Sequence, residues 1–317
     1  MLRREFLGLF GCAAVACPYV VRARESKAQI RIGMLPLGSS SSAYDRSLVE
    51  AFRQGLRQVG LLENRDILLD VVWIGGDPDE SVKQLIERGA ELLIPCGSSA
   101  SVAVKRQTST IPIVFISVGN PVAMGLVDSL PRPGQNATGF ADILADLGSK
   151  LVELAREMNR PREIVDYLWH SEWPDGLNRY QGTEQAAATA GVKLQSNAIA
   201  DASAIGDAIK ALKDGGASTL IVQPSPLTFQ QRARIIGTAT RYGIGTIWAF
   251  PAAAREGGMI AYGPDYIHMY RKAPLYVERV IKGTKPANLP VELPSKVELL
   301  VNLNTAKTLG SKFRYRS

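Results

Sequence analysis

Small hydroxyl side chains stand at two similar places in this chain, each directly after an apolar run and directly before a run with helical spacing. The first place is Ser98 and Ser99, in ELLIPCGSSASVAVKRQT (residues 91–108), and the second is Ser225, in STLIVQPSPLTFQQRARI (residues 218–235). A helix that begins at such a corner presents unpaired N–H groups and a partial positive charge, which suit a polar or anionic ligand. The sequence therefore predicts that two similar corners, one in each half of the chain, bind a polar solute.

The residue types and spacings that most enzymes need are sparse. The chain has two histidines, His170 and His268, and it contains no G-x-S-x-G elbow, no phosphate-binding G-x-x-x-x-G-K-[ST] loop and no H-E-x-x-H metal motif. We therefore expect a binding protein and not an enzyme, with no cofactor and no metal. Turnover of a bound solute stays open as a less favoured alternative.

From Ile30 onward, short apolar runs alternate with amphipathic runs. Helical spacing is clear where Leu48, Phe52 and Leu56 fall on one face. This alternation predicts an α/β fold of two doubly wound domains, each a parallel sheet with helices on both faces. Ligands of such sheets bind outside the carboxyl ends of the strands, so the two corners would form the two walls of one cleft. Strands are expected at residues 30–37, 66–74, 91–96, 111–116, 163–169, 192–199, 218–223 and 244–250.

The C-terminal part of the chain is expected to return to the first half. It predicts a strand, an N-cap at Asp265 and a long helix that Pro274 interrupts. We therefore assign residues 29–140 and about 266–317 to one domain and residues 141–265 to the other, joined by a multi-crossover hinge. Such a hinge allows two domains to close on a ligand.

Residues 1–28 have the pattern of an export signal. Arg3 and Arg4 precede a short apolar stretch, and R-R-E-F-L matches the R-R-x-F-L core of a twin-arginine signal, while Sec export stays open as an alternative. Cleavage near the end of this leader would place the mature chain in the periplasm. Lipid anchoring at Cys12 or Cys17 is less favoured, because neither cysteine lies in a good lipoprotein signal.

The composition is that of a soluble globular protein. The 317 residues suit two domains, and 46% of them are hydrophobic and 21% charged. The net charge of +7 is spread along the chain without a basic cluster, which argues against a nucleic-acid surface. Without the leader, Cys96 is the one cysteine left, so neither an internal disulfide nor a cysteine metal site is expected. We expect a monomer.

Two stretches carry a family resemblance: PIVFISVGNPVAMGLVDSLPRPGQNATGF (residues 112–140) and the segment from GGMIAYGPDYIHMY to NLNTAKTLG (residues 257–310). With the RREF leader, they resemble the periplasmic solute-binding proteins of ABC importers, in the family that includes the tryptophan/tyrosine-binding lipoproteins. The resemblance implies the type I periplasmic-binding-protein fold and capture of a small solute. It also implies delivery of that solute to a membrane permease and its ATPase. A periplasmic ligand sensor that signals to a membrane receptor is the main alternative.

The resemblance also implies which corners contact the solute. Hydroxyl and amide side chains would hold its polar end, and aromatic side chains would stack on a flat ligand, although each aromatic could equally pack in the core. The ligand-binding residues predicted in this way are Ser39, Ser40, Tyr44, Ser98, Ser99, Asn120, Trp169, His170, Trp173, Ser225, Phe250 and Tyr262.

Two departures from the family pattern bear on the ligand. Many relatives carry Asp where this chain has Asn120, and amino-acid binders tend to place Asp or Asn around the Ser225 corner. A ligand ammonium buried without a carboxylate partner would be costly. We therefore expect a small carboxylate or a neutral aromatic solute in place of a free amino acid, unless Asp142, Glu172 or another acid reaches the site.

Overall fold

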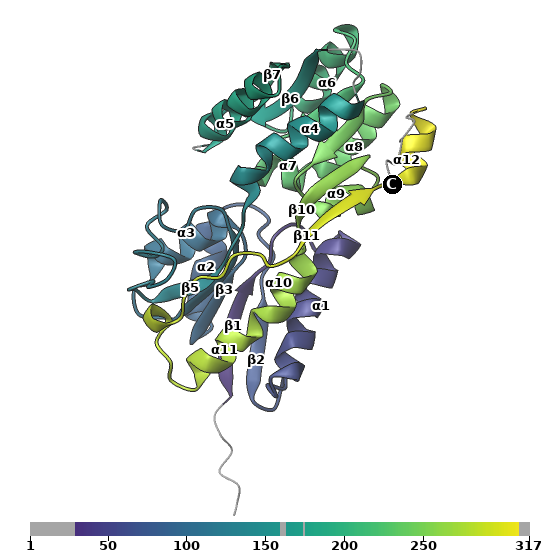
Figure 1. Cartoon of the computed structure of the whole chain (residues 1–317). Coiled ribbons are helices and arrows are strands. Elements are labelled where there is room, and N and C mark those ends of the chain that lie inside the picture. The colour runs from purple at the N-terminus through teal and green to yellow at the C-terminus, as the bar shows by residue number, and fades with distance from the viewer. Residues whose placement is uncertain (1–28, 159–162, 174, 311–317) are drawn as a thin grey trace, which may run out of the picture.

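The chain folds into two halves, each built on its own sheet (Figure 1). The computed structural model describes residues 29–158, 163–173 and 175–310, so the predicted leader lies outside the described residues. Within these ranges, no helix combines the length and the apolar character that a membrane span requires.

The sheet of the first half has five parallel strands in the order β2-β1-β3-β4-β5. Every residue of β3 and β4 is buried, because helices cover both faces of the sheet. Helices α2 and α3 pack on one face, and α1 packs with α10 (Tyr266–Lys272) and α11 (Pro274–Ile281) on the other. The bounds are β1 (Ile30–Leu35), α1 (Ala43–Gln58), β2 (Ile67–Val71), α2 (Pro78–Glu87), β3 (Leu92–Pro95), α3 (Ser98–Gln107), β4 (Ile113–Val118) and β5 (Ala137–Ala141).

The sheet of the second half has six strands in the order β11-β10-β9-β8-β6-β7, in which β11 is Val297–Val301. All neighbours pair in parallel except β10 and β11. Among its helices, α4 packs with α5, and α8 packs with α6, α7 and α9. The bounds are a 3₁₀ turn η1 (Leu144–Leu147), α4 (Gly148–Met158), β6 (Ile164–His170), α5 (Gly176–Thr189), β7 (Lys193–Ile199), α6 (Ile205–Asp214), β8 (Thr219–Val222), α7 (Pro226–Gln230), α8 (Arg232–Arg241), β9 (Gly245–Trp248), α9 (Pro251–Arg255) and β10 (Ile260–Pro264).

The C-terminal part crosses between the halves twice. The helical segment predicted after Asp265 is confirmed. The carboxylate of Asp265 accepts a hydrogen bond from the N–H of His268 at 2.9 Å. The predicted interruption at Pro274 is also confirmed, since one helix ends before this residue and the next begins with it. These elements are α10 (Tyr266–Lys272), α11 (Pro274–Ile281), a 3₁₀ turn η2 (Pro286–Asn288), β11 (Val297–Val301) and α12 (Leu303–Thr308).

The end of the chain departs from the predicted domain division. Residues 266–317 were assigned to the first half, but β11 pairs antiparallel with β10 in the second sheet. This pairing satisfies the backbone groups on the free side of β10, which would otherwise be an open edge. The described chain therefore crosses between the halves three times: after β5, between β10 and α10, and before β11 (Figure 1).

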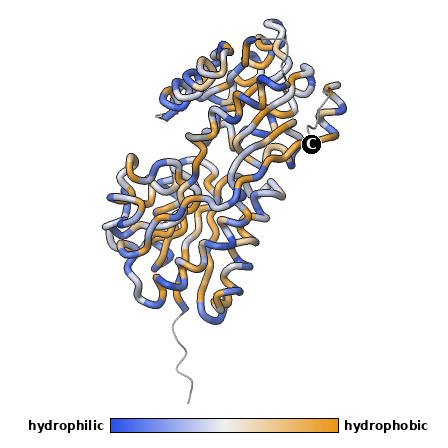
Figure 2. The backbone as a smooth tube through the Cα atoms, viewed as in Figure 1, coloured by the Kyte–Doolittle hydropathy of each residue, from blue (hydrophilic) through white to orange (hydrophobic). Residues whose placement is uncertain are grey.

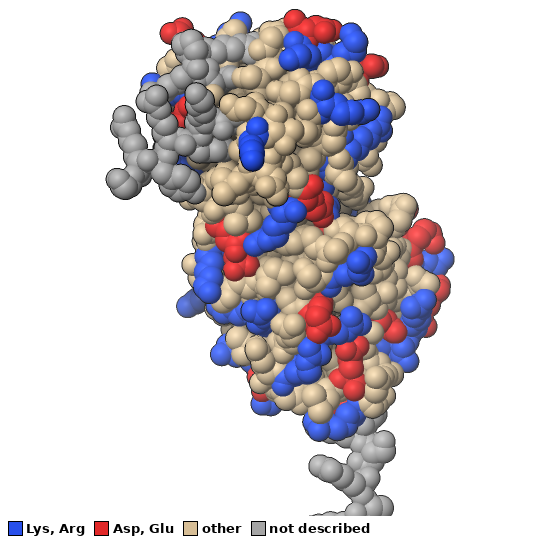
Figure 3. Space-filling model, turned by 90° about the vertical axis from the view of Figure 1, so that its right-hand side faces the viewer, with Lys and Arg blue, Asp and Glu red and all other residues tan. Residues whose placement is uncertain are grey.

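Hydropathy follows this architecture. Hydrophobic residues are concentrated along the strands of both sheets, and hydrophilic residues are concentrated on the outer helices and loops (Figure 2). On the face shown in Figure 3, Lys and Arg are interspersed with Asp and Glu over both halves. That face therefore carries no broad field of one sign.

Candidate ligand pocket

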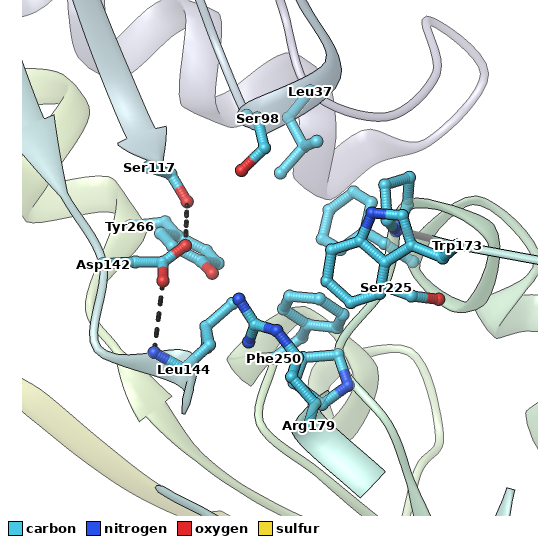
Figure 4. Close-up of a pocket in the computed structure, with 14 residues that line it drawn as sticks. Leu37, Ser98, Ser117, Asp142, Leu144, Trp173, Arg179, Ser225, Phe250 and Tyr266 are labelled. Carbon is cyan, nitrogen blue, oxygen red and sulfur yellow. Dashed lines mark hydrogen bonds between the residues drawn. The ribbon is translucent and has the colours of Figure 1, made fainter. Parts of the chain in front are cut away.

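A pocket lies between the two halves, where loops and helix starts of both sheets meet (Figure 4). The space between its lining atoms, including the part open to solvent at its mouth, is about 410 Å³. The residues that line it are Leu37, Gly97, Ser98, Ser117, Asp142, Leu144, Trp173, Arg179, Pro224, Ser225, Pro226, Phe229, Phe250 and Tyr266.

One end of the pocket is polar. Asp142, which is 7% exposed, follows β5 at the first crossover. Its carboxylate accepts hydrogen bonds from the hydroxyl of Ser117 at 3.3 Å and from the N–H of Leu144 at 3.1 Å. Burial raises the pKa of the Tyr266 phenol well above its usual value, and the negative charge of Asp142 adds to this effect. A neutral phenol and a carboxylate therefore lie together at this end.

Arg179 brings a positive charge to the same end from the second half. It lies in the first turns of α5, and its side chain is 8% exposed. The guanidinium donates from Nε to Asp175 at 2.6 Å and lies 5.0 Å from the ring centre of Trp173. Its Nη1 is buried and finds no hydrogen-bond partner among the described residues. In Figure 4 the side chain points to the end where Asp142 and Tyr266 lie.

Gly119, just after β4 in the first half, lies against the guanidinium that Arg179 extends from the second half. A Cβ atom built on this residue would lie 2.6 Å from Nη2 of Arg179 and 3.6 Å from Oδ1 of Asp142. Contacts below 3.0 Å are essentially never seen for a real Cβ atom. The missing side chain therefore lets the guanidinium of the second half reach the backbone of the first.

The other end of the pocket is aromatic. Phe229 and Phe250 are 1% and 4% exposed, and their rings meet edge to face with centres 4.8 Å apart. The ring of Trp173 also lines the pocket (Figure 4). Such an arrangement accepts a flat apolar group. The pocket thus combines an aromatic end with an end that carries both signs of charge.

The two serine corners reach the pocket, but their hydroxyls are already used within the protein. Ser225 caps α7: its Oγ accepts from the N–H of Thr228 at 3.2 Å, and its own N–H donates to the Thr228 hydroxyl at 3.0 Å. Ser98 begins α3 and accepts from the N–H of Gly119 at 3.4 Å. Both serines therefore hold the backbone of the pocket walls in place through these hydrogen bonds.

Four of the predicted ligand-binding residues line the pocket: Ser98, Trp173, Ser225 and Phe250. The other eight lie outside its lining. Ser39, Ser40, Ser99 and Asn120 are exposed, and the amide oxygen of Asn120 accepts from the N–H of Ala123 at 3.0 Å.

The remaining four predicted residues are held by other contacts. Trp169 still belongs to β6, where it stacks on Tyr180 at 5.1 Å and donates to Ser196 at 2.8 Å. His170 contacts the carbonyl of Ala200 at 3.1 Å through Nε2. Tyr262 is half-buried in β10, and Tyr44 is buried beneath Arg255, whose guanidinium carbon lies 5.5 Å from the centre of the Tyr44 ring.

The polar end holds the residues that sequence reasoning missed. Ser117, Arg179 and Tyr266 were not predicted, since nothing in their local sequence distinguishes them from helix or strand positions. Asp142 was named only as an acid that could overturn the ligand argument. It lines the pocket, so this acid does reach the site, and the expectation of a ligand without an amino group stays a prediction. Among the described residues, no group of three or more His, Cys, Asp and Glu could hold a metal ion.

Comparisons with known proteins agree with the fold and identify the family. Residues 42–314 match the family described as ABC transporter substrate binding protein. A tyrosine-binding protein of Clostridioides difficile (strain R20291) is 23% identical over 288 residues, which cover 90% of this chain and 82% of the relative. An ABC domain from Streptococcus pneumonia, solved in complex with L-Trp, is 20% identical with a TM-score of 0.79, over 90% of this chain and 96% of that one.

A conserved domain protein of Vibrio cholerae gives the same TM-score of 0.79 at 21% identity, again over 90% of this chain and 96% of that one. The predicted type I periplasmic-binding-protein fold is thereby confirmed, as is the expectation of a solute-binding protein and not an enzyme. With most of its length matched, this chain belongs to the substrate-binding protein family of ABC transporters.

Proposed function

We propose that this protein is the solute-binding component of an ABC importer and that its ligand is a small aromatic solute with a carboxylate, of the aromatic α-amino acid class. The observation that carries the proposal is the buried Nη1 of Arg179, which has no hydrogen-bond partner among the described residues. An unsatisfied buried donor is costly, so a ligand acceptor at this point would be strongly favoured. A carboxylate is the acceptor that a guanidinium prefers.

The rest of the pocket supports the same class. Asp142 supplies a negative charge at the polar end, where it can face a ligand ammonium. Trp173, Phe229 and Phe250 supply a surface for a flat ring. The similar proteins are a tyrosine-binding protein of Clostridioides difficile and a Streptococcus protein solved in complex with L-Trp. Both amino acids have a carboxylate, an ammonium group and an aromatic ring. This proposal replaces the sequence-based expectation of a ligand without an amino group.

Isothermal titration of the purified protein with a matched ligand set tests the class. The set is L-tryptophan, L-tyrosine, indole-3-propionate, which lacks the amine, and tryptamine, which lacks the carboxylate. Each missing charged group should weaken binding by about tenfold or more, because a charge-assisted hydrogen bond contributes about 1.5–3 kcal/mol. Equal affinity for tryptamine and L-tryptophan would rule out carboxylate recognition. No binding of any of the four would overturn the ligand class.

The proposed transport role needs partners and a location. We propose that residues 1–28 direct export to the periplasm, where the protein acts as a monomer and delivers its solute to a permease with its ATPase. Support comes from the family, whose members act outside the cytoplasm. Deleting the gene should abolish uptake of radiolabelled ligand at low concentration. A sensor that signals to a membrane receptor would instead leave uptake intact and alter a cellular response.

A further inference from the structure

A second set of charges joins the two halves outside the pocket. Nη2 of Arg232, in α8, donates to both carboxylate oxygens of Asp45, in α1, at 2.9 Å each. Nε of Arg232 donates to Glu256, just after α9, at 2.9 Å. The side chains of Arg232, Asp45 and Glu256 are 4%, 0% and 24% exposed. We call these three residues the interdomain charge cluster.

The cluster is divided unequally between the halves. Arg232 and Glu256 both belong to the second half, whereas Asp45 belongs to the first. Ser42, at the start of α1, donates to Glu256 at 2.9 Å and accepts from Arg232 at 3.0 Å. If the halves move apart, Arg232 keeps Glu256 and loses Asp45, and Asp45 exchanges the guanidinium for water.

The cluster supports the pocket walls without lining the pocket. The guanidinium of Arg232 lies 4.4 Å from the ring centre of Phe229, and its Nη1 donates to the Phe229 carbonyl at 2.8 Å. On the other side, Asp45 accepts from the N–H of Ser39 at 2.9 Å, two residues beyond Leu37. Phe229 and Leu37 both line the pocket. A change at the cluster would therefore reach one wall in each half.

Burying a carboxylate is expensive unless a positive charge accompanies it. Asp45 is the most deeply buried member, and burial raises the pKa of its carboxyl while the charge of Arg232 opposes the rise. Hydration supplies the same compensation when the halves are apart. The arrangement with the halves together is thus the one that depends on Arg232.

We propose that Arg232 is a positioning residue for solute capture: it neutralises Asp45 at the interface and so allows the two halves to close. The part that concerns affinity rests on the proposed function, and the part that concerns closure does not. The pair acts through the pocket walls and does not touch the solute. If this is correct, removing Arg232 should matter only while the Asp45 carboxylate is present. A role of Arg232 in packing alone would not depend on the charge of Asp45.

Three variants and wild type test the proposal by small-angle X-ray scattering without ligand. Arg232→Gln leaves Asp45 buried without its counter-charge, so its radius of gyration should exceed that of wild type. Asp45→Asn and the double variant R232Q/D45N have no carboxylate to bury at this position, so both should stay as compact as wild type. Equal radii for R232Q and wild type would overturn the proposal. So would a double variant as expanded as R232Q, because that result would assign the effect to lost packing.

Affinity for L-tryptophan provides the second readout. R232Q should bind at least about thirtyfold more weakly, as expected when one partner of a buried charge pair is removed. The double variant should match D45N. Glu256→Gln is the matched carboxylate control: Glu256 stays beside Arg232 in both arrangements, so its effect should be much smaller than that of R232Q.

Two failures have separate meanings. If wild type does not bind L-tryptophan, the proposed ligand class fails while the scattering comparison still decides the closure proposal. If R232Q does not fold, D45N and R232Q/D45N decide it, because without Asp45 the guanidinium has no buried charge to neutralise. A double variant that binds much more weakly than D45N, or is clearly more expanded, then contradicts the proposal.

Discussion

Gly119→Ala tests whether Arg179 recognises a ligand carboxylate, because it displaces the guanidinium without removing it. The new Cβ atom would lie 2.6 Å from Nη2, whereas ordinary contact begins at 3.4 Å, so the end of the side chain must move by about 0.8 Å (3.4 − 2.6). The end of an arginine is flexible, and the backbone of Gly119 does not have a positive φ. The free energy of unfolding should therefore change by less than about 0.5 kcal/mol.

The same displacement matters for binding. A hydrogen bond between nitrogen and oxygen has a favoured range of only about 0.5 Å in length, so a shift of this size removes or strongly weakens it. A hydrogen bond to a charged group contributes about 1.5–3 kcal/mol. The dissociation constant for L-tryptophan should therefore rise by about 10- to 150-fold.

Titration calorimetry with L-tryptophan and tryptamine, on wild type and Gly119→Ala, makes the test specific. The substitution should weaken L-tryptophan binding strongly and tryptamine binding little, since tryptamine has no carboxylate for Arg179. Gly182→Ala is the matched control, because it adds the same methyl group to α5 with no atom within 4 Å. The reasoning fails if both ligands weaken equally, or if L-tryptophan binding is unchanged in a correctly folded variant.

Three further outcomes follow from the described contacts. Trp173→Ala should lower L-tryptophan affinity by about tenfold or more, because Trp173 lines the pocket. Trp169→Ala removes a ring that is stacked outside the pocket, so it should change this affinity by no more than about twofold. Titration calorimetry, which does not depend on tryptophan fluorescence, compares the two variants. Burial raises the pKa of the Cys96 thiol to about 12, so iodoacetamide at pH 8 should modify this residue only in denaturant, as peptide mass spectrometry would show. Burial likewise raises the pKa of Tyr167 to about 12. The unfolded chain releases that proton first, so stability should fall as pH rises from 10 to 12, and Tyr167→Phe should reduce the fall in melting temperature.

Local features of the chain could be predicted from the sequence because local physics decides them. The apolar runs became strands, since a strand buried on both faces needs apolar side chains at every position. The helix break at Pro274 and the cap at Asp265 depend on one ring and one carboxylate. The pairing of β11 with β10 could not be predicted in this way, because it depends on which sheet offers a free edge after the chain has crossed between the halves for the third time.

The aromatic predictions separate at the end of one strand. Trp169 and Trp173 flank the same corner, but β6 continues through His170, so Trp169 keeps a strand position and packs on Tyr180. Trp173 lies beyond the strand and reaches the pocket. A one- or two-residue error in the strand end is enough to exchange these roles, and sequence patterns do not fix strand ends that closely.

The two serine corners that first indicated a binding site do face one pocket, but they leave most of the recognition to longer side chains. Ser225 and Ser98 are committed to hydrogen bonds within the protein. The charges at the polar end instead come from Arg179, which reaches across from α5, and from Asp142 at the crossover. Neither position reads as a site residue in isolation, because each gains its role when the halves meet. The small corner residues leave room for that meeting, and Gly119 does so most directly, since even a Cβ atom there would crowd the guanidinium.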